Sequence, residues 1–266
     1  MKKRILSILL LCCMVLTLLP TTVLAADGPM DTIPKYDVSI DVYNRTSDIS
    51  IKDSRSYYIY SSVPDKLRDT WAWDKKIFIK GDKTAPHVFI DGVNIKMSPS
   101  SKGPAIELNK KASAYLYFIG KDSTLQGADG RAAIQKNRSE GQLYVLARTG
   151  TTVTCKGGDK AAGIGGSWAT RNIAESLFNL DMYGHGTNMH FGSQTNPSLW
   201  SGTIIAKGGD GGAGIGGGRN GSGEKLYFYS GKIEATGGEM GAGIGGSFKG
   251  RGRDIYIYGG DISATG

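Results

Sequence analysis

Three acidic residues recur at the same point of a repeated motif, because Asp159, Asp210 and Glu239 each directly follow a Gly-Gly pair. If the repeats stack as strands do, these carboxylates form a column with about 5 Å between neighbouring coils. Such a column would suit calcium binding or the paired carboxylates of glycoside hydrolysis. Solvated turn residues explain the same pattern, and we favour that interpretation. We therefore expect no cofactor and no metal, with calcium as the alternative.

Tyrosines recur in a second column. Aligning the repeats places four of them at one position and two more two residues further on: Tyr117, Tyr144, Tyr227 and Tyr256, then Tyr229 and Tyr258. Leu226 and Phe228 alternate with tyrosines, so the apolar set faces inward and the tyrosines face outward. An exposed aromatic strip would stack on sugar rings while its phenol groups bond sugar hydroxyls. A stacked ladder that only covers the sheet is the alternative.

One interval between repeats is longer than the others. Ile164 and Ile215 are 51 residues apart, about 22 more than one repeat, which predicts an inserted coil or loop over about 167–200. Functional residues often lie in such insertions. The candidate ligand-binding residues here are Trp168, His185, His190 and Trp200. The spacing of the two histidines matches no metal signature, and a degenerate coil with residues 180–183 as its strand is the alternative interpretation.

The elements that must position these residues are short and regularly spaced. The segment Ala-Gly-Ile-Gly-Gly occurs at 162–166, 213–217 and 242–246, the last two copies 29 residues apart. Self-similarity at this period indicates a stacked array. Three short strands per repeat of about 28–30 residues, each bounded by glycine, predict an all-β, right-handed, single-stranded parallel β-helix with isoleucine stacked inside. A β-propeller is the rival, but it needs four antiparallel strands per unit.

The chain divides into three parts. Residues 1–25 form an expected signal peptide, with a basic start, an apolar stretch and small residues before a cleavage site. Residues 26–76 are more irregular and predict an N-terminal cap, with Trp71 and Trp73 as an apolar lid. Residues 77–266 form the predicted β-helix. It stops where the next glycine turn is due, so we expect truncation and further domains of a longer parent chain. Cys155 is expected to be a buried strand residue.

The charge distribution limits the expected partners. The formal net charge is +8, of which three charges belong to the signal peptide. The basic residues are scattered and are not interleaved with aromatics, which excludes a nucleic-acid site. We expect no membrane span after signal cleavage. A mildly positive chain would suit an acidic polysaccharide or cell-wall polymer.

The combination of a strand, a Gly-Gly-acid turn and Ala-Gly-Ile-Gly-Gly resembles a Gly-rich repeat of secreted surface proteins of Gram-positive bacteria. Those proteins are commonly described as carbohydrate-binding-domain-containing and are similar to the pectate-lyase-type β-helix superfamily. The resemblance covers Ile77 to the end, including 88–95, which looks like an opening coil. It implies an extracellular, cell-wall-associated protein that contacts glycans, and it supplies no catalytic motif.

These observations predict a secreted, cell-surface carbohydrate-binding or adhesion module without catalytic activity. Repetition suits multivalent binding, whereas catalysis needs a single pre-organised group of residues. A polysaccharide lyase or glycosidase with its site near the insertion is the first alternative. A structural stalk that displays other domains is the second.

Overall fold

Short parallel strands account for nearly all of the regular structure. The computed structural model describes residues 35–266, except 83, 99, 100, 102, 110, 138, 139 and 169–183. The expected signal peptide lies outside these residues. Within them the chain has 21 strands and one short 3-10 helix, η1 (Asp65–Leu67). In this part of the chain no helix has the length and apolar character needed to cross a membrane.

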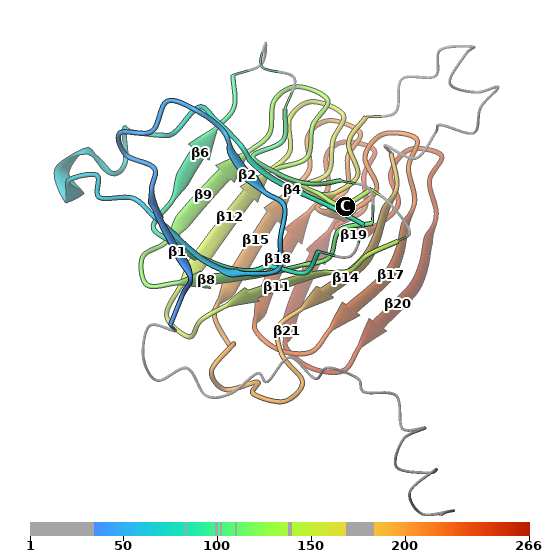
Figure 1. The fold of residues 1–266 in the computed structure, drawn as a ribbon. Helices are drawn as coiled ribbons and strands as arrows, with labels where there is room; N and C mark the ends of the chain where they lie inside the picture. Colours follow the sequence, from blue (N-terminus) through green and yellow to red (C-terminus); the bar gives the residue numbers. More distant parts are fainter. Residues whose placement is uncertain are drawn as a thin grey trace, which may run out of the picture.

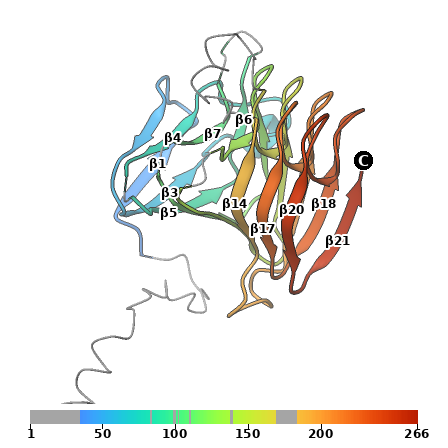
Figure 2. The same cartoon turned by 90° about the vertical axis from the view of Figure 1, so that its right-hand side faces the viewer.

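The strands form three parallel sheets, and most coils contribute one strand to each (Figure 1). Sheet A runs β1 (Val38–Asp41), β3 (Ser56–Tyr60), β5 (His87–Asp91), β8 (Ala114–Ile119), β11 (Leu143–Ala147), β14 (Gly186–Phe191), β17 (Gly223–Phe228) and β20 (Gly252–Ile257). Sheet B runs β2 (Ile49–Ile51), β4 (Ile77–Lys80), β7 (Ile106–Asn109), β10 (Ile134–Gln135), β13 (Ile164–Gly165), β16 (Ile215–Gly216) and β19 (Ile244–Gly245). Sheet C runs β6 (Asn94–Lys96), β9 (Ser123–Gln126), β12 (Thr152–Lys156), β15 (Thr203–Lys207), β18 (Lys232–Thr236) and β21 (Asp261–Thr265). The predicted parallel β-helix is confirmed, and Figure 2 shows its coils stacked in chain order.

The stack begins before Ile77. Strands β1 and β3 join sheet A, and β2 joins sheet B, so much of the expected cap consists of regular coils. Trp73 bridges Ile95 at the sheet C position, and its indole Nε1 donates to Arg45 O at 2.8 Å. These strands are only three to five residues long. The polar composition and the prolines of the region made them difficult to predict from the sequence.

An isoleucine column runs through the core of sheet B. Residues of successive coils pair directly in the order Ile49, Ile77, Ile106, Ile134, Ile164, Ile215 and Ile244. All but the last are buried. Since each buried isoleucine contributes about 1.5–3 kcal/mol, this column is a major source of stability. The predicted inward stack is confirmed.

The glycines of Ala-Gly-Ile-Gly-Gly make this stacking sterically feasible. Gly165 has φ of +130°, and a Cβ there would lie 2.2 Å from Gly216 O. Gly216 in turn would place a Cβ 2.0 Å from Gly245 O. Backbone therefore packs directly on backbone from one coil to the next, which no other residue type permits.

The long interval between Ile164 and Ile215 adds no extra coil. The two isoleucines pair directly, and the coil between them supplies β14 and β15 like any other. The added residues lie instead in longer connections before and after β14. The strand proposed at residues 180–183 lies outside the described residues, as does much of the first connection. The second, 192–202, is described.

Candidate functional site

A continuous stack of aromatic rings covers the outer face of sheet A. Six rings occupy one register position on successive strands: His87, Tyr115, Tyr144, His190, Tyr227 and Tyr256. Neighbouring ring centroids are 4.4–5.2 Å apart, and the interplanar angles are 18° or less. We call this set the aromatic ladder.

The ladder presents ring edges, because neighbouring rings cover each other's faces. Each inner ring is stacked on both sides, for example Tyr144 between Tyr115 and His190. Such stacking stabilises the outer face of a sheet. A sugar ring approaching the middle of the ladder therefore meets edges and hydroxyl groups rather than open aromatic faces.

Tyr117 does not belong to the ladder, contrary to the sequence alignment. It pairs with Leu146 and Phe89, two residues further along their strands than the ladder positions. A shift of two residues leaves a side chain on the same face of a strand, so alternation alone could not detect the error. Tyr117 is 3 % exposed and lies in a neighbouring column with Tyr58 and Phe89.

The two histidines of the insertion have separate environments. His190 lies in the ladder, with Nδ1 3.3 Å from Tyr229 Oη. Burial lowers the pKa of His190 from 6.5 to about 4, so its ring is neutral at physiological pH. His185 Nδ1 instead accepts a hydrogen bond from Ser222 N at 3.1 Å. The ladder position of His190 could not be read from tyrosine spacing.

The connection 192–202 folds back onto sheet A. Trp200 is 2 % exposed and packs in one cluster with Tyr117 and Leu146. Thr149 Oγ1 donates to Ser198 O at 2.6 Å, and Ser230 Oγ donates to Trp200 O at 2.7 Å. This loop is therefore anchored to the coils on both sides of it.

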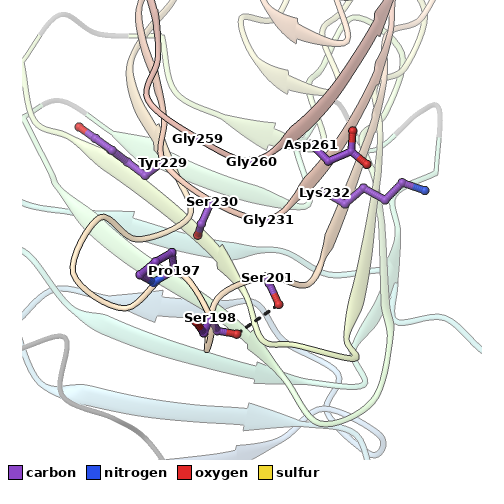
Figure 3. Close-up of a pocket in the computed structure, with 10 residues that line it drawn as sticks. All are labelled: Pro197, Ser198, Ser201, Tyr229, Ser230, Gly231, Lys232, Gly259, Gly260 and Asp261. Carbon is purple, nitrogen blue, oxygen red and sulfur yellow. Dashed lines mark hydrogen bonds between the residues drawn. The ribbon is translucent and has the colours of Figure 1, made fainter.

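A groove of about 500 Å³ lies between this loop and the turns of the next two coils (Figure 3). It is lined by Pro197, Ser198, Ser201, Tyr229, Ser230, Gly231, Lys232, Gly259, Gly260 and Asp261. We call it the corner groove. Gly192 directly follows Phe191, the partner of Phe228, and so stands beside Tyr229 without a side chain. A Cβ on Gly192 would lie 2.4 Å from Ser230 O, so this residue packs closely against the turn that follows Tyr229.

The lining of the corner groove contains one residue expected from the sequence and several that were not expected. Tyr229 was an expected ligand-binding residue, and Tyr258 stacks on it at 5.4 Å. The serines and glycines of the lining went unnoticed, because they come from a loop and two turns that meet only in the folded chain. Trp200 packs the loop against sheet A and does not line the groove.

Charged residues lie at one side of the groove. Figure 3 shows the ends of Lys232 and Asp261 across from Tyr229 and Pro197. Lys232 Nζ is 2.7 Å from Glu234 Oε1, and this contact raises the pKa of the lysine. Lys232 and Asp261 also occupy paired positions on β18 and β21.

The Gly-Gly-acid turns stack at a different corner, between sheets C and B. A Cβ on Gly209 would lie 2.0 Å from Gly158 O, and one on Gly238 equally close to Gly209 O. Asp159, Asp210 and Glu239 are exposed there, and Asp159 Oδ2 pairs with Lys160 Nζ at 2.8 Å. Among the described residues, no group of three or more His, Cys, Asp or Glu could hold a metal ion.

Trp168 lies outside the groove lining. It follows β13, is 37 % exposed, and its ring lies 4.7 Å from Lys160 Nζ. Four of the expected ligand-binding residues thus lie together in the aromatic ladder, namely Tyr144, His190, Tyr227 and Tyr256, and Tyr229 is the one that lines the groove. Cys155 is buried, as expected, and burial raises the pKa of its thiol.

Comparison with known families agrees with the coil structure. A beta helix repeat matches residues 200–219 and 229–248, which contain β15 with β16 and β18 with β19. No curated protein and no solved structure matches the chain. The match supports the β-helix superfamily.

Proposed function

We propose that this protein is a secreted, non-catalytic carbohydrate-binding module of the cell surface, and that the corner groove is its sugar site. The resemblance of its repeats to Gly-rich surface proteins of Gram-positive bacteria supports an extracellular, wall-associated location. Its partner would be a polysaccharide or cell-wall glycan.

The corner groove is the observation that carries this proposal. Small-molecule sites are concave, largely apolar and supplied with a few well-placed polar groups. The groove has Pro197 and the Tyr229 ring on one side and the hydroxyl groups of Ser198 and Ser201 nearby. Its loop is held by the hydrogen bonds from Thr149 and Ser230. Since the walls are fixed before binding, little conformational entropy is lost on association.

The lining favours binding over hydrolysis. Glycosidases of the usual kind place two carboxyl groups about 5–9.5 Å apart on either side of the scissile bond. Among the residues that line the groove, Asp261 is the one carboxylic acid. The acids of the Gly-Gly turns lie at another corner.

A structural stalk is the second candidate, and the aromatic ladder favours it. Rings whose faces are all occupied by neighbours, such as Tyr144 and His190, stiffen the outer sheet without offering a surface to a ligand. A rigid solenoid with such a face would serve well to display other domains.

Glycan-array screening followed by calorimetry tests the proposal. We expect binding that Tyr229→Ala lowers by about tenfold or more, because an aromatic wall is removed. Tyr60→Ala is the matched control, since Tyr60 lies on the same sheet far from the groove. Equal loss in both variants would point away from the groove. Release of reducing ends or unsaturated products would establish an enzyme, and neither binding nor turnover would leave the stalk.

A further inference from the structure

The net positive charge of the chain suggests an acidic glycan, but the corner groove itself offers no uncompensated cation among its lining residues. Lys232 is the cationic residue of the lining, and Glu234 already pairs with it at 2.7 Å. Asp261 adds a negative charge at the adjacent position of the next coil. The net charge in and beside the groove is therefore neutral to negative.

A carboxylate placed in this groove would meet an unfavourable field. Removing an ionised group from water is costly unless a partner charge or several hydrogen bonds replace the solvent. The charge of Lys232 is already offset by Glu234, so Lys232 would attract a second carboxylate only weakly. Surface charges elsewhere on the chain act through water and salt, which screen them beyond about 8–10 Å.

The remaining lining suits an uncharged sugar. The rings of Tyr229 and Pro197 offer an apolar surface to the C–H groups of a pyranose. The hydroxyl groups of Ser198 and Ser201 can both donate and accept a hydrogen bond, as sugar hydroxyls require, whereas that of Ser230 is already bonded to Trp200 O and Ser193 N. Gly231, Gly259 and Gly260 carry no side chains, so a ligand can approach the turn backbone closely.

We propose that the corner groove binds a neutral hexopyranose residue and discriminates against uronic acids. This inference rests on the carbohydrate-binding function proposed above and gives it a substrate class. The groove, at about 500 Å³, lies within the 300–1,000 Å³ range of sites for small ligands. It would therefore hold one sugar residue of a longer chain, while the rest of the glycan runs over the surface.

The test compares neutral and uronic-acid oligosaccharides of equal length, measured by calorimetry on the full chain at low and high salt. The neutral sugars are expected to bind at least about tenfold more tightly than the uronates, with little dependence on salt. Asp261→Lys is expected to raise uronate affinity about tenfold, because it replaces the negative charge at the groove by a positive one. Asp210→Lys makes the same charge change at another corner and is the matched control.

A second variant, Ser201→Ala, is expected to lower neutral-sugar affinity about three- to tenfold through loss of one hydroxyl partner. Circular dichroism and thermal unfolding establish that each variant is folded. If uronates bind more tightly than neutral sugars, with steep salt dependence, the inference is wrong while the carbohydrate-binding function stands. If neutral sugars bind but neither groove variant changes any affinity, the site lies elsewhere. If no glycan binds, the function and the inference fail together.

Discussion

Nδ1 of His190 lies 3.3 Å from the hydroxyl oxygen of Tyr229, and this contact joins the aromatic ladder to the wall of the corner groove. His190 is stacked between Tyr144 and Tyr227, so its ring is held in place from both sides. Through this contact the ladder helps to fix the orientation of the Tyr229 ring, which a ligand in the groove would touch. Stability of the ladder and shape of the groove are linked through this pair.

The buried position of His190 predicts a pH-dependent stability. Its folded pKa of about 4 is below the ordinary value of 6.5, so the unfolded chain binds more protons between these pH values. The free energy of unfolding should therefore fall as pH drops from 6.5 to 4, by on the order of 3 kcal/mol, and level off below. Denaturant titrations across this window measure it.

His190→Tyr is the informative variant for this effect, since tyrosine already occupies most ladder positions. It should remove that contribution to the pH dependence while preserving the stack. His185→Asn, outside the ladder, is the control. An unchanged slope in His190→Tyr would show that other groups cause the dependence.

The isoleucine column predicts a large loss on truncation. Ile164→Ala removes a fully buried side chain between two other isoleucines, so a cavity forms. The expected destabilisation is about 2–5 kcal/mol. Ile257→Ala, at a position 61 % exposed, should cost less than about 1 kcal/mol. Chemical denaturation compares the two, and similar losses would contradict the central role of the column.

Substitution of two glycines with positive φ distinguishes the cost of a steric clash from the cost of backbone strain. Gly165→Ala places a Cβ 2.2 Å from Gly216 O, whereas Gly150→Ala meets nothing within 4 Å. Gly150→Ala should therefore cost only the strain of its backbone angle, about 1–3 kcal/mol. Gly165→Ala should cost clearly more or prevent folding, because the coils must move apart. Thermal unfolding of both variants measures the difference, and equal costs would argue against tight backbone packing.

The loop anchor at Thr149 can be removed without changing side-chain size. Thr149→Val deletes the hydroxyl that donates to Ser198 O, and we expect a loss of about 1 kcal/mol. Cleavage within 192–202 during limited proteolysis should become faster, and any glycan affinity should fall with it. Thr154→Val, in the middle of β12, is the control. A variant that resists cleavage like the parent chain would mean that the remaining contacts, among them Thr149 N to Leu199 O and Ser230 Oγ to Trp200 O, hold the loop without this hydroxyl.

The sequence predicted the architecture well because its signals are local and periodic. The sequence predicts short strands bounded by glycine, and β18 and β21 lie between such glycines. The sequence left an inserted coil and an inserted loop as alternatives between Ile164 and Ile215, and the direct pairing of these two residues excludes the extra coil. Strands without flanking glycine pairs, such as β1 and β2, gave no comparable signal.

The site was harder to predict because it depends on register and on distant segments. Tyr117 was misplaced by two residues, which preserves its face but changes its column. The groove needs a loop of one coil and the turns of two later coils, Ser230–Gly231 and Gly259–Gly260, to come together. No spacing along the chain encodes that meeting.

The direct pairing of Ile164 with Ile215 has a practical consequence. Fifty-one residues span the same vertical step that twenty-nine span in the next coil, and the strands on either side keep their partners. Part of this extra length lies between β14 and β15, where residues 192–202 stand in place of residues 229–231 of the next coil, so chain length at this corner is independent of coil geometry. This corner is a natural grafting point, where peptides of different length and composition can be exchanged to give the scaffold new binding specificities.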